Sequence, residues 1–339
     1  MDSPCAELLF SLPPKELAQS AGERVLFIRA EATPALFKLP KERLVVSQSE
    51  KGKAAKLEAL GLENQLSPAG EFDTVYLLPG KQRHENLFNF ARAWKFLRPG
   101  GICLAAMPNE LGSKRFEKHF KEIFEEFDSL SKHHARVFWG RRSSANTTNA
   151  TVDEWLGLGG LQVCKVSGLM SQPGIFGWDK VDTGSELLAR HLPTSLYGTG
   201  ADLGAGYGFL SSHILRTNPN IQEFHLYENE FLGIEACKIN TTTDHKAKLE
   251  YCWQDISRGI PKLRYDWIVT NPPFHSGKNS DFGVGRRFVQ VAAESLKKGG
   301  ELYMVSNLHL PYEAILRELF SEEKNLVRER GFKVLHARL

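Results

Sequence analysis

The sequence contains the same α/β pattern twice, and this duplication constrains the fold more than any other feature. In residues 72–120 and again in residues 265–320, an aromatic-Asp pair opens a short apolar strand that ends at proline. A helix, a Gly-Gly pair that follows Arg-Pro in the first copy and Lys-Lys in the second, an apolar strand and another helix follow in both. The segments 135–141 and 332–338 then have the pattern of a matching final strand. Because alternating strands and helices form parallel sheets, we predict two copies of one α/β unit.

Residues 141–160 separate the two copies and have the composition of a linker. They are polar and then glycine-rich, without a hydrophobic period. We therefore predict a first domain over residues 1–143, a linker over residues 144–164 and a second domain over residues 165–339.

Composition excludes several functional classes. The five cysteines are scattered, with no C-x-x-C and no histidine cluster at metal-ligand spacing, which argues against disulfides and a metal site and for a reducing compartment. The N-terminus lacks the basic and then apolar run of a signal peptide, and no apolar stretch approaches the roughly 18 residues of a membrane span. The net charge of +3 permits nucleic acid binding without indicating it. We expect a cytoplasmic monomer with no metal ion and no membrane contact.

A glycine-rich turn opens the second copy. Gly204, Gly206 and Gly208 follow a short strand, and a helical pattern begins at Phe209. Glycine lets the backbone turn tightly and approach a ligand closely, but dinucleotide sites, flavin sites and ordinary turns share this feature. The Walker lysine is absent, so a triphosphate ligand is not expected.

Three acidic residues lie near the carboxyl ends of successive predicted strands. Asp202 precedes the first loop glycine by two positions, Glu228 ends the strand 223–228, and Asp255 ends the segment 249–255. The carboxyl ends of parallel strands line the crevice in which such sheets bind ligands. We therefore predict that these acids border a ligand site, with Glu228 placed to hold a ribose diol.

The predicted strand 265–270 runs directly into the sequence Asn-Pro-Pro-Phe. The two prolines stop the strand and keep the chain extended and stiff. An exocyclic amine on a base is a poor nucleophile, because its lone pair is delocalised into the ring. Asn271 Oδ1 and the carbonyl oxygen of Pro272 could accept its two N–H bonds and turn the lone pair toward an electrophile. Phe274 offers a face on which a base can stack.

The motif Asp-Leu-Gly-Ala-Gly-Tyr-Gly, the two later acids and Asn-Pro-Pro-Phe together resemble class I S-adenosylmethionine-dependent methyltransferases that modify exocyclic amines. The segments 173–193, 271–277 and 307–316 are more closely similar to the bacterial 16S ribosomal RNA guanine-N2 methyltransferases. The close likeness covers about residues 165–339, and the N-terminal part is similar mainly in layout. The resemblance implies an α/β fold of two tandem Rossmann-like domains with doubly wound sheets, the first of them degenerate.

The resemblance also implies a cofactor, a substrate and residue roles. One S-adenosylmethionine is expected in the second domain, with Gly204–Gly208 around its methionine part, Glu228 on the ribose and Asp255 near the adenine amine, and Asp202 is a further expected cofactor-binding residue. The expected reaction methylates N2 of a guanine in 16S ribosomal RNA within the small subunit. The expected catalytic residues are Asn271, Pro272 and Phe274. A guanine in folded RNA would have to be unpaired or flipped out to reach them.

Several residues near the motif are candidates for contact with RNA, although each is also typical of a solvated surface. They are His275, Lys278, Arg286 and Arg287. His309 and Tyr312 could border the base or serve in packing. Upstream, the lead-in 174–185 is expected to cover the cofactor, and Asp182-Thr183 predicts an N-cap for the helix 185–191.

The first copy has lost both functional loops. No glycines follow the first strand in residues 24–34, and residues 78–81, Leu-Pro-Gly-Lys, stand in place of Asn-Pro-Pro-Phe. We predict that residues 1–143 bind no cofactor and either position RNA or brace the second domain. The basic residues in 132–136 and 141–142 suit RNA binding or a solvated edge equally well.

Other functions fit parts of the pattern. Asn-Pro-Pro-Phe also suits methylation of guanine N2 in 23S RNA, of adenine N6 in DNA or of a protein glutamine, because each target is a planar amine. Glutamine methyltransferases usually have tyrosine at the fourth position. A non-enzymatic RNA-binding assembly factor is a further alternative, and the intact glycine loop and Asn271 argue against it.

Overall fold

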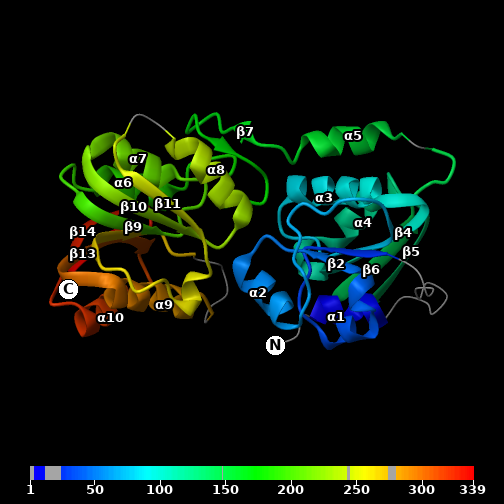
Figure 1. Cartoon of the computed structure of the whole chain (residues 1–339), viewed down its shortest axis with the longest axis horizontal. Coiled ribbons are helices and arrows are strands. Elements are labelled where there is room, and N and C mark those ends of the chain that lie inside the picture. The colour runs from blue at the N-terminus through cyan, green and yellow to red at the C-terminus, as the bar shows by residue number, and fades with distance from the viewer. Residues whose placement is uncertain (1–3, 12–23, 147, 243–244, 274–279) are drawn as a thin grey trace. The chain divides into compact units, whose positions relative to one another are not determined.

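The chain divides into two compact units, which we call unit 1, ending at Gly160, and unit 2, beginning at Leu161. The structure is a computed structural model, and it describes residues 4–11, 24–146, 148–242, 245–273 and 280–339 (Figure 1). Three predicted site residues, Phe274, His275 and Lys278, lie outside the described residues.

The described strands of unit 1 form one six-stranded sheet in which four parallel strands are followed by an antiparallel pair. The strands are β1 (Val25–Ile28), β2 (Leu44–Ser47), β3 (Phe72–Leu77), β4 (Leu97–Pro108), β5 (Glu125–Lys132) and β6 (Ala135–Arg141). Their order across the sheet is β2-β1-β3-β4-β6-β5.

Helices cover both faces of this sheet. They are α1 (Pro4–Ser11), α2 (Lys51–Ala59), α3 (Arg83–Phe96), α4 (Ser113–Lys121) and α5 (Ala150–Gly157), with 3-10 helices η2 (Pro34–Lys38), η3 (Lys41–Arg43) and η4 (Asn109–Leu111). Successive strand side chains point to opposite faces. Leu26 and Ile28 therefore pack with α3, α4 and α5, whereas Val25 and Phe27 pack with α1 and α2. Both faces are buried, which explains why β1 is apolar at every position.

Unit 2 contains a seven-stranded sheet among its described strands, with the order β11-β10-β9-β12-β13-β15-β14. The strands are β9 (Tyr197–Leu203), β10 (Asn220–Glu228), β11 (Lys248–Trp253), β12 (Tyr265–Thr270), β13 (Leu296–Asn307), β14 (Glu322–Glu329) and β15 (Phe332–Arg338). A short antiparallel pair, β7 (Gln162–Val163) and β8 (Met170–Ser171), precedes them. From β9 the chain runs outward on one side of the sheet through β10 and β11, and then crosses over to run outward on the other side through β12 and β13. Ligands bind at such a switch in strand order.

The helices of unit 2 also lie on two faces. They are α6 (Thr183–His191), α7 (Phe209–Thr217) and α8 (Phe231–Thr241) on one face, and α9 (Ser280–Ser295) and α10 (Tyr312–Leu319) on the other. A 3-10 helix, η5 (Ile256–Arg258), follows β11. None of the helices that the structure describes is both long enough and apolar enough to cross a membrane.

The two units repeat each other in detail at the Gly-Gly pairs, which confirms the predicted duplication. Gly100 and Gly299 have φ angles of 77° and 79°, in the region that favours glycine. At both Gly101 and Gly300, a Cβ atom would lie within 3.1 Å of a carbonyl oxygen on the neighbouring strand. Each pair therefore needs its first glycine for backbone conformation and its second for the close approach of two strands.

The prediction of a linker over residues 144–164 is wrong at its centre. Residues 150–157 form α5, which is capped by Asn149, whose Oδ1 accepts from the N–H groups of Thr151 and Val152 at 3.0 and 3.2 Å. Val152 and Trp155 are buried against α3 in the core of unit 1. Val152, Trp155 and Leu156 have helical spacing, but they form only a short apolar run between polar and glycine-rich stretches. The boundary between the units falls after residue 160 rather than at 143 or 165.

Candidate active site

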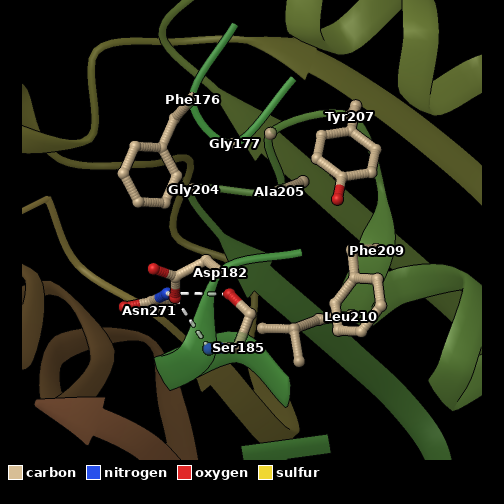
Figure 2. Close-up of a pocket in the computed structure, with 11 residues that line it drawn as sticks. Phe176, Gly177, Asp182, Ser185, Gly204, Ala205, Tyr207, Phe209, Leu210 and Asn271 are labelled. Carbon is tan, nitrogen blue, oxygen red and sulfur yellow. Dashed lines mark hydrogen bonds between the residues drawn. The ribbon is translucent and has the colours of Figure 1, made fainter. Parts of the chain in front are cut away.

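A pocket that is partly open to solvent lies at the carboxyl ends of β9 and β12 (Figure 2). Its lining comes from three segments that are distant in sequence: the lead-in before α6, the glycine loop with the start of α7, and the end of β12. The lining residues are Phe176, Gly177, Asp182, Ser185, Gly204, Ala205, Gly206, Tyr207, Phe209, Leu210 and Asn271. The pocket therefore occupies the switch in strand order at which a ligand is expected.

The three loop glycines are required for different reasons. All have positive φ, 88° at Gly204, 54° at Gly206 and 87° at Gly208. A Cβ atom on Gly208 would lie 2.8 Å from the sulfur of Cys237, so this glycine allows α7 to approach α8. A Cβ atom on Gly206 would meet nothing within 4 Å among the described residues. The backbone at Gly206 is thus open for close approach of a ligand.

Glu228 fixes the position of the glycine loop. Its Oε2 accepts from the N–H of Gly206 at 2.7 Å, and its Oε1 accepts from the N–H of Glu230 at 2.7 Å. Burial raises the pKa of Glu228, and the backbone N–H donors partly oppose this effect. The contact with ribose stays a prediction.

Asp202 does not line the pocket, although we predicted that it binds the cofactor. It is 0% exposed and accepts a hydrogen bond from Ser211 Oγ at 2.6 Å, and its Oδ1 has no partner among the described residues. Burial raises the pKa of Asp202 to about 7. The residue therefore supports the loop from beneath, because its side chain points into the fold at the end of β9.

Replacing Asp202 by asparagine should stabilise the protein at alkaline pH. The folded state binds a proton at Asp202 up to about pH 7, whereas the unfolded state loses it near the ordinary aspartate pKa of 3.8. Stability from this group is present at low pH and is lost as pH rises through about 7. Asparagine carries no charge at any pH, so we expect Asp202→Asn to gain about 2–4 kcal/mol relative to the native protein between about pH 5 and pH 8. Urea unfolding at several pH values measures this difference, and a pH-independent difference would contradict the protonation of Asp202.

Asp255 lies at the end of β11, where it caps η5. Its Oδ1 accepts from the N–H and the Oγ–H of Ser257 at 3.0 and 2.6 Å. It is partly exposed and does not line the pocket, so its predicted contact with adenine stays a prediction.

Asn271 lines the pocket, and its amide has hydrogen-bond partners among the described residues at one end only. Its Nδ2 donates to Asp182 Oδ2 at 2.9 Å and to Ser185 Oγ at 2.8 Å. Its Oδ1 accepts no hydrogen bond from a residue that the structure describes. Pro272 is buried next to it, and Thr270 Oγ1 donates to the carbonyl oxygen of Leu203 at 2.7 Å, which ties the end of β12 to β9.

The lead-in contributes contacts that sequence reasoning predicted only in part. The N-cap is confirmed, since Asp182 Oδ2 accepts from the N–H of Ser185 at 2.8 Å. The link from this cap to Asn271 was missed. The sequence carries no sign of it, because 89 residues separate Asp182 from Asn271.

The remaining candidates lie away from the pocket. Arg286 and Arg287 are on α9, where Arg286 lies 4.0 Å from Glu318, and Arg287 pairs with Glu294 at 2.9 Å. Tyr312 is fully buried and serves in packing, whereas His309 is exposed. Within the described residues, no group of three or more His, Cys, Asp or Glu side chains is arranged to hold a metal ion.

In unit 1, a side chain fills the place that corresponds to the glycine loop. Arg29 has a φ of 55° and follows β1 at the position that Gly204 takes after β9, as the matching registers to β3 and β12 show. Its Nε donates to the carbonyl oxygen of Leu78 at 3.1 Å, and its Nη1 pairs with Glu85. The guanidinium thus lies over the strand ends of unit 1.

The acid of the second strand is also replaced in unit 1. Gln48 stands at the position of Glu228, and its Oε1 accepts from the N–H of Glu50 at 2.9 Å, as Glu228 does from Glu230. Its Nε2 donates to the carbonyl oxygen of Ala30 at 2.8 Å. Gln48 therefore keeps the hydrogen bond to the backbone N–H two residues later. It has an uncharged amide where unit 2 has the carboxyl group of Glu228.

Comparison with known proteins gives a consistent assignment. The profile of the family described as "Methyltransferase small domain" matches residues 167–336, half of the chain. The chain belongs to this family. The match covers the pocket, the glycine loop and Asn271 of unit 2.

Similar proteins extend over both units. The chain is 26% identical over 276 residues to the ribosomal RNA small subunit methyltransferase C of Psychromonas ingrahamii, covering 78% of this chain and 75% of that protein. It is 25% identical to the protein of the same name from Shewanella pealeana, over 87% of this chain and 90% of the relative. Among solved structures, the T. thermophilus 16S rRNA N2 G1207 methyltransferase, in complex with AdoMet and guanosine, superposes with a TM-score of 0.81 at 26% identity, covering 99% and 92% of the two chains. The predicted family and the tandem α/β fold are confirmed.

Proposed function

We propose that this chain transfers a methyl group from S-adenosylmethionine to the N2 amine of a guanine in 16S ribosomal RNA. The observation that carries the proposal is the Asn271 amide, which lines a glycine-loop pocket and whose Nδ2 donates to two acceptors, while its Oδ1 accepts from no residue that the structure describes. The relatives support the substrate, because they are named as methyltransferases of small-subunit ribosomal RNA and one is described as acting on guanine N2.

The pocket fits S-adenosylmethionine. Gly206 leaves open space beside its backbone, and the glycines at 204 and 208 hold the turn that exposes it. We assign the loop to the methionine part of the cofactor, Glu228 to the ribose and Asp255 to the adenine end. The cofactor supplies an activated methyl group on a positively charged sulfur.

The residues of this chain act on the amine. Asn271 Oδ1 and the carbonyl oxygen of Pro272 accept the two N–H bonds of guanine N2, so that the nitrogen becomes more tetrahedral and its lone pair, less delocalised into the ring, points toward the methyl group. Phe274 stacks against the base, which contributes about 1–3 kcal/mol of binding. Holding the amine in line with the methyl group supplies most of the rate enhancement, and no strong general base is required.

The two units have different roles in the proposal. Unit 2 carries the whole cofactor site, and unit 1, with Arg29 over its strand ends, positions the RNA or braces unit 2. We propose that the protein acts as a monomer in the cytoplasm on the assembled 30S particle. Arg286, Arg287, His275 and Lys278 are the proposed contacts with RNA near the target base, which must be unpaired or flipped out.

Methyl labelling tests this function directly. Purified protein with methyl-labelled S-adenosylmethionine is incubated with unmodified 30S subunits, 50S subunits, naked 16S RNA and naked 23S RNA, and the labelled nucleoside is mapped. We expect N2-methylguanosine at one position of 16S RNA, formed faster in 30S particles than in naked RNA. Label in 23S RNA alone would assign the chain to the large subunit, and no label in any RNA would refute the proposal.

A further inference from the structure

The N-cap of α6 is joined to the end of β12 by a small hydrogen-bond network. Asp182 Oδ2 accepts from the N–H of Ser185 at 2.8 Å and from Asn271 Nδ2 at 2.9 Å. The Oγ of Ser185 lies 2.8 Å from the same Nδ2. Figure 2 shows the three side chains grouped on one side of the pocket, with dashed lines between them. Two residues of the lead-in therefore engage the amide nitrogen of Asn271.

This network selects one orientation of the Asn271 amide. The oxygen and nitrogen ends of an asparagine amide have nearly the same shape, so packing alone discriminates poorly between the two orientations. An ionised carboxylate can only accept hydrogen bonds. If the amide were reversed, Oδ1 would take the place of Nδ2, which lies 2.9 Å from Asp182 Oδ2. Two acceptor oxygens at that distance would repel each other. The Asp182 carboxylate thus keeps Nδ2 next to itself and leaves Oδ1 at the opposite end of the amide, without a partner among the described residues.

The network also strengthens Oδ1 as an acceptor. A hydrogen bond from an amide to a charged carboxylate is stronger than one between neutral groups. It polarises the amide and shifts electron density onto its oxygen. A more negative Oδ1 holds the N–H of a planar amine more firmly, which is the step that an exocyclic amine requires.

Packing holds the network in place. Leu187 and Leu188 on α6 are buried in the core of unit 2. A Cβ atom on Gly184 would lie 3.1 Å from Asp182 Oδ2 and 3.2 Å from the ring of Phe332, so the first turn of α6 has little free space around it. The position of Asp182 is therefore set by the core rather than by a ligand.

We propose that Asp182 and Ser185 are positioning residues that orient the Asn271 amide for the methyl transfer. This inference rests on the proposed function of Asn271 as an acceptor for the target amine. It assigns the lead-in a role in the chemistry that is separate from covering the cofactor.

Two substitutions separate this role from helix capping. Ser185→Ala removes an acceptor for Asn271 and keeps the backbone N–H that Asp182 caps. Asp182→Asn keeps an effective N-cap and the side-chain size but replaces the charged acceptor by a neutral amide. We expect kcat to fall by about 10-fold in Ser185→Ala and by about 10- to 100-fold in Asp182→Asn. The melting temperature and the Kd for S-adenosylmethionine should stay near the native values. Glu186→Gln removes a charge from the same turn without touching Asn271 and serves as the matched control with native kcat.

A double-mutant cycle provides the decisive readout. If Asp182 acts through Asn271, then Asp182→Asn should lower kcat no further in a protein that already carries Asn271→Ala. Additive losses would overturn the proposal, as would a loss expressed mainly in the Kd for the cofactor.

A measurement independent of activity distinguishes this inference from the proposed function. In ¹⁵N NMR, the side-chain amide hydrogens of Asn271 should exchange with water slowly in the native protein and faster in both variants, because Ser185→Ala removes an acceptor and Asp182→Asn replaces a charged acceptor by a weaker neutral one. Native protein that protects the amide but methylates no RNA would refute the proposed function alone. Equal exchange in native protein and variants would refute the positioning role, whatever the substrate.

Discussion

Asn271→Ala should lower the turnover of RNA methylation by about a hundredfold or more while leaving the affinity for S-adenosylmethionine nearly unchanged. In the proposed mechanism, the substitution removes the Oδ1 acceptor that holds the target amine, so the cost should fall on the transition state. The glycine loop and its contacts to Glu228 do not involve Asn271, and the cofactor should therefore bind normally. Single-turnover methylation of 30S particles, with calorimetry of cofactor binding beside it, measures both quantities.

A second asparagine provides the control for this experiment. Asn325 lies on β14, the outermost strand of the unit 2 sheet, and Asn325→Ala should retain native turnover. Near-normal turnover in Asn271→Ala would show that the amine is held elsewhere. A hundredfold loss of cofactor affinity would instead place Asn271 in the cofactor site.

Arg29→Ala should destabilise unit 1 by about 3–5 kcal/mol, because it leaves Glu85 as a buried carboxylate without its charge partner. The side chains of Arg29 and Glu85 are 21% and 11% exposed, and burial raises the pKa of Glu85 while the Arg29 guanidinium lowers it. The loss should appear in urea unfolding followed by the fluorescence of Trp94, which is buried in unit 1.

The pair of Arg98 and Asp73 is a matched control, because Arg98 is exposed and Asp73 keeps a hydrogen bond from the N–H of Arg24 when Arg98 is removed. Arg98 Nη1 lies 2.6 Å from Asp73, but the arginine side chain is 56% exposed, so Arg98→Ala should cost no more than about 1 kcal/mol. The double variant Arg29→Ala with Glu85→Gln should be more stable than Arg29→Ala alone, since it removes the unpaired charge. Equal losses from Arg29→Ala and Arg98→Ala would contradict a buried ion pair at the strand ends of unit 1.

The same variant addresses the role of unit 1. If unit 1 positions the RNA, partial unfolding caused by Arg29→Ala should weaken methylation of 30S particles while unit 2 still binds S-adenosylmethionine. If unit 1 braces unit 2, cofactor binding should decline together with methylation. Full methylation by a protein whose unit 1 is unfolded would exclude both roles.

Much of the fold was predictable because its signals are local. The apolar strands β3 and β12 end at proline, and the glycine pairs that follow α3 and α9 recur with the same geometry in both units. The final strands β6 and β15 have the predicted bounds. The strands β5 and β14 were not predicted, since they lie at sheet edges with mostly exposed, charged side chains and lack an apolar pattern.

The sequence by itself determined the two α/β units, the glycine loop and the position of Asn271 at the end of a strand. These features depend on backbone conformation and on the period of apolar residues, and neighbouring residues set both. Only the tertiary structure decided what these residues contact. It buried Asp202 beneath the loop, placed Asp182 against an amide 89 residues further along the chain, and paired Arg29 with Glu85 across 56 residues. Such contacts arise when parallel strands bring their carboxyl ends to one edge, so that side chains remote in sequence share the same buried space.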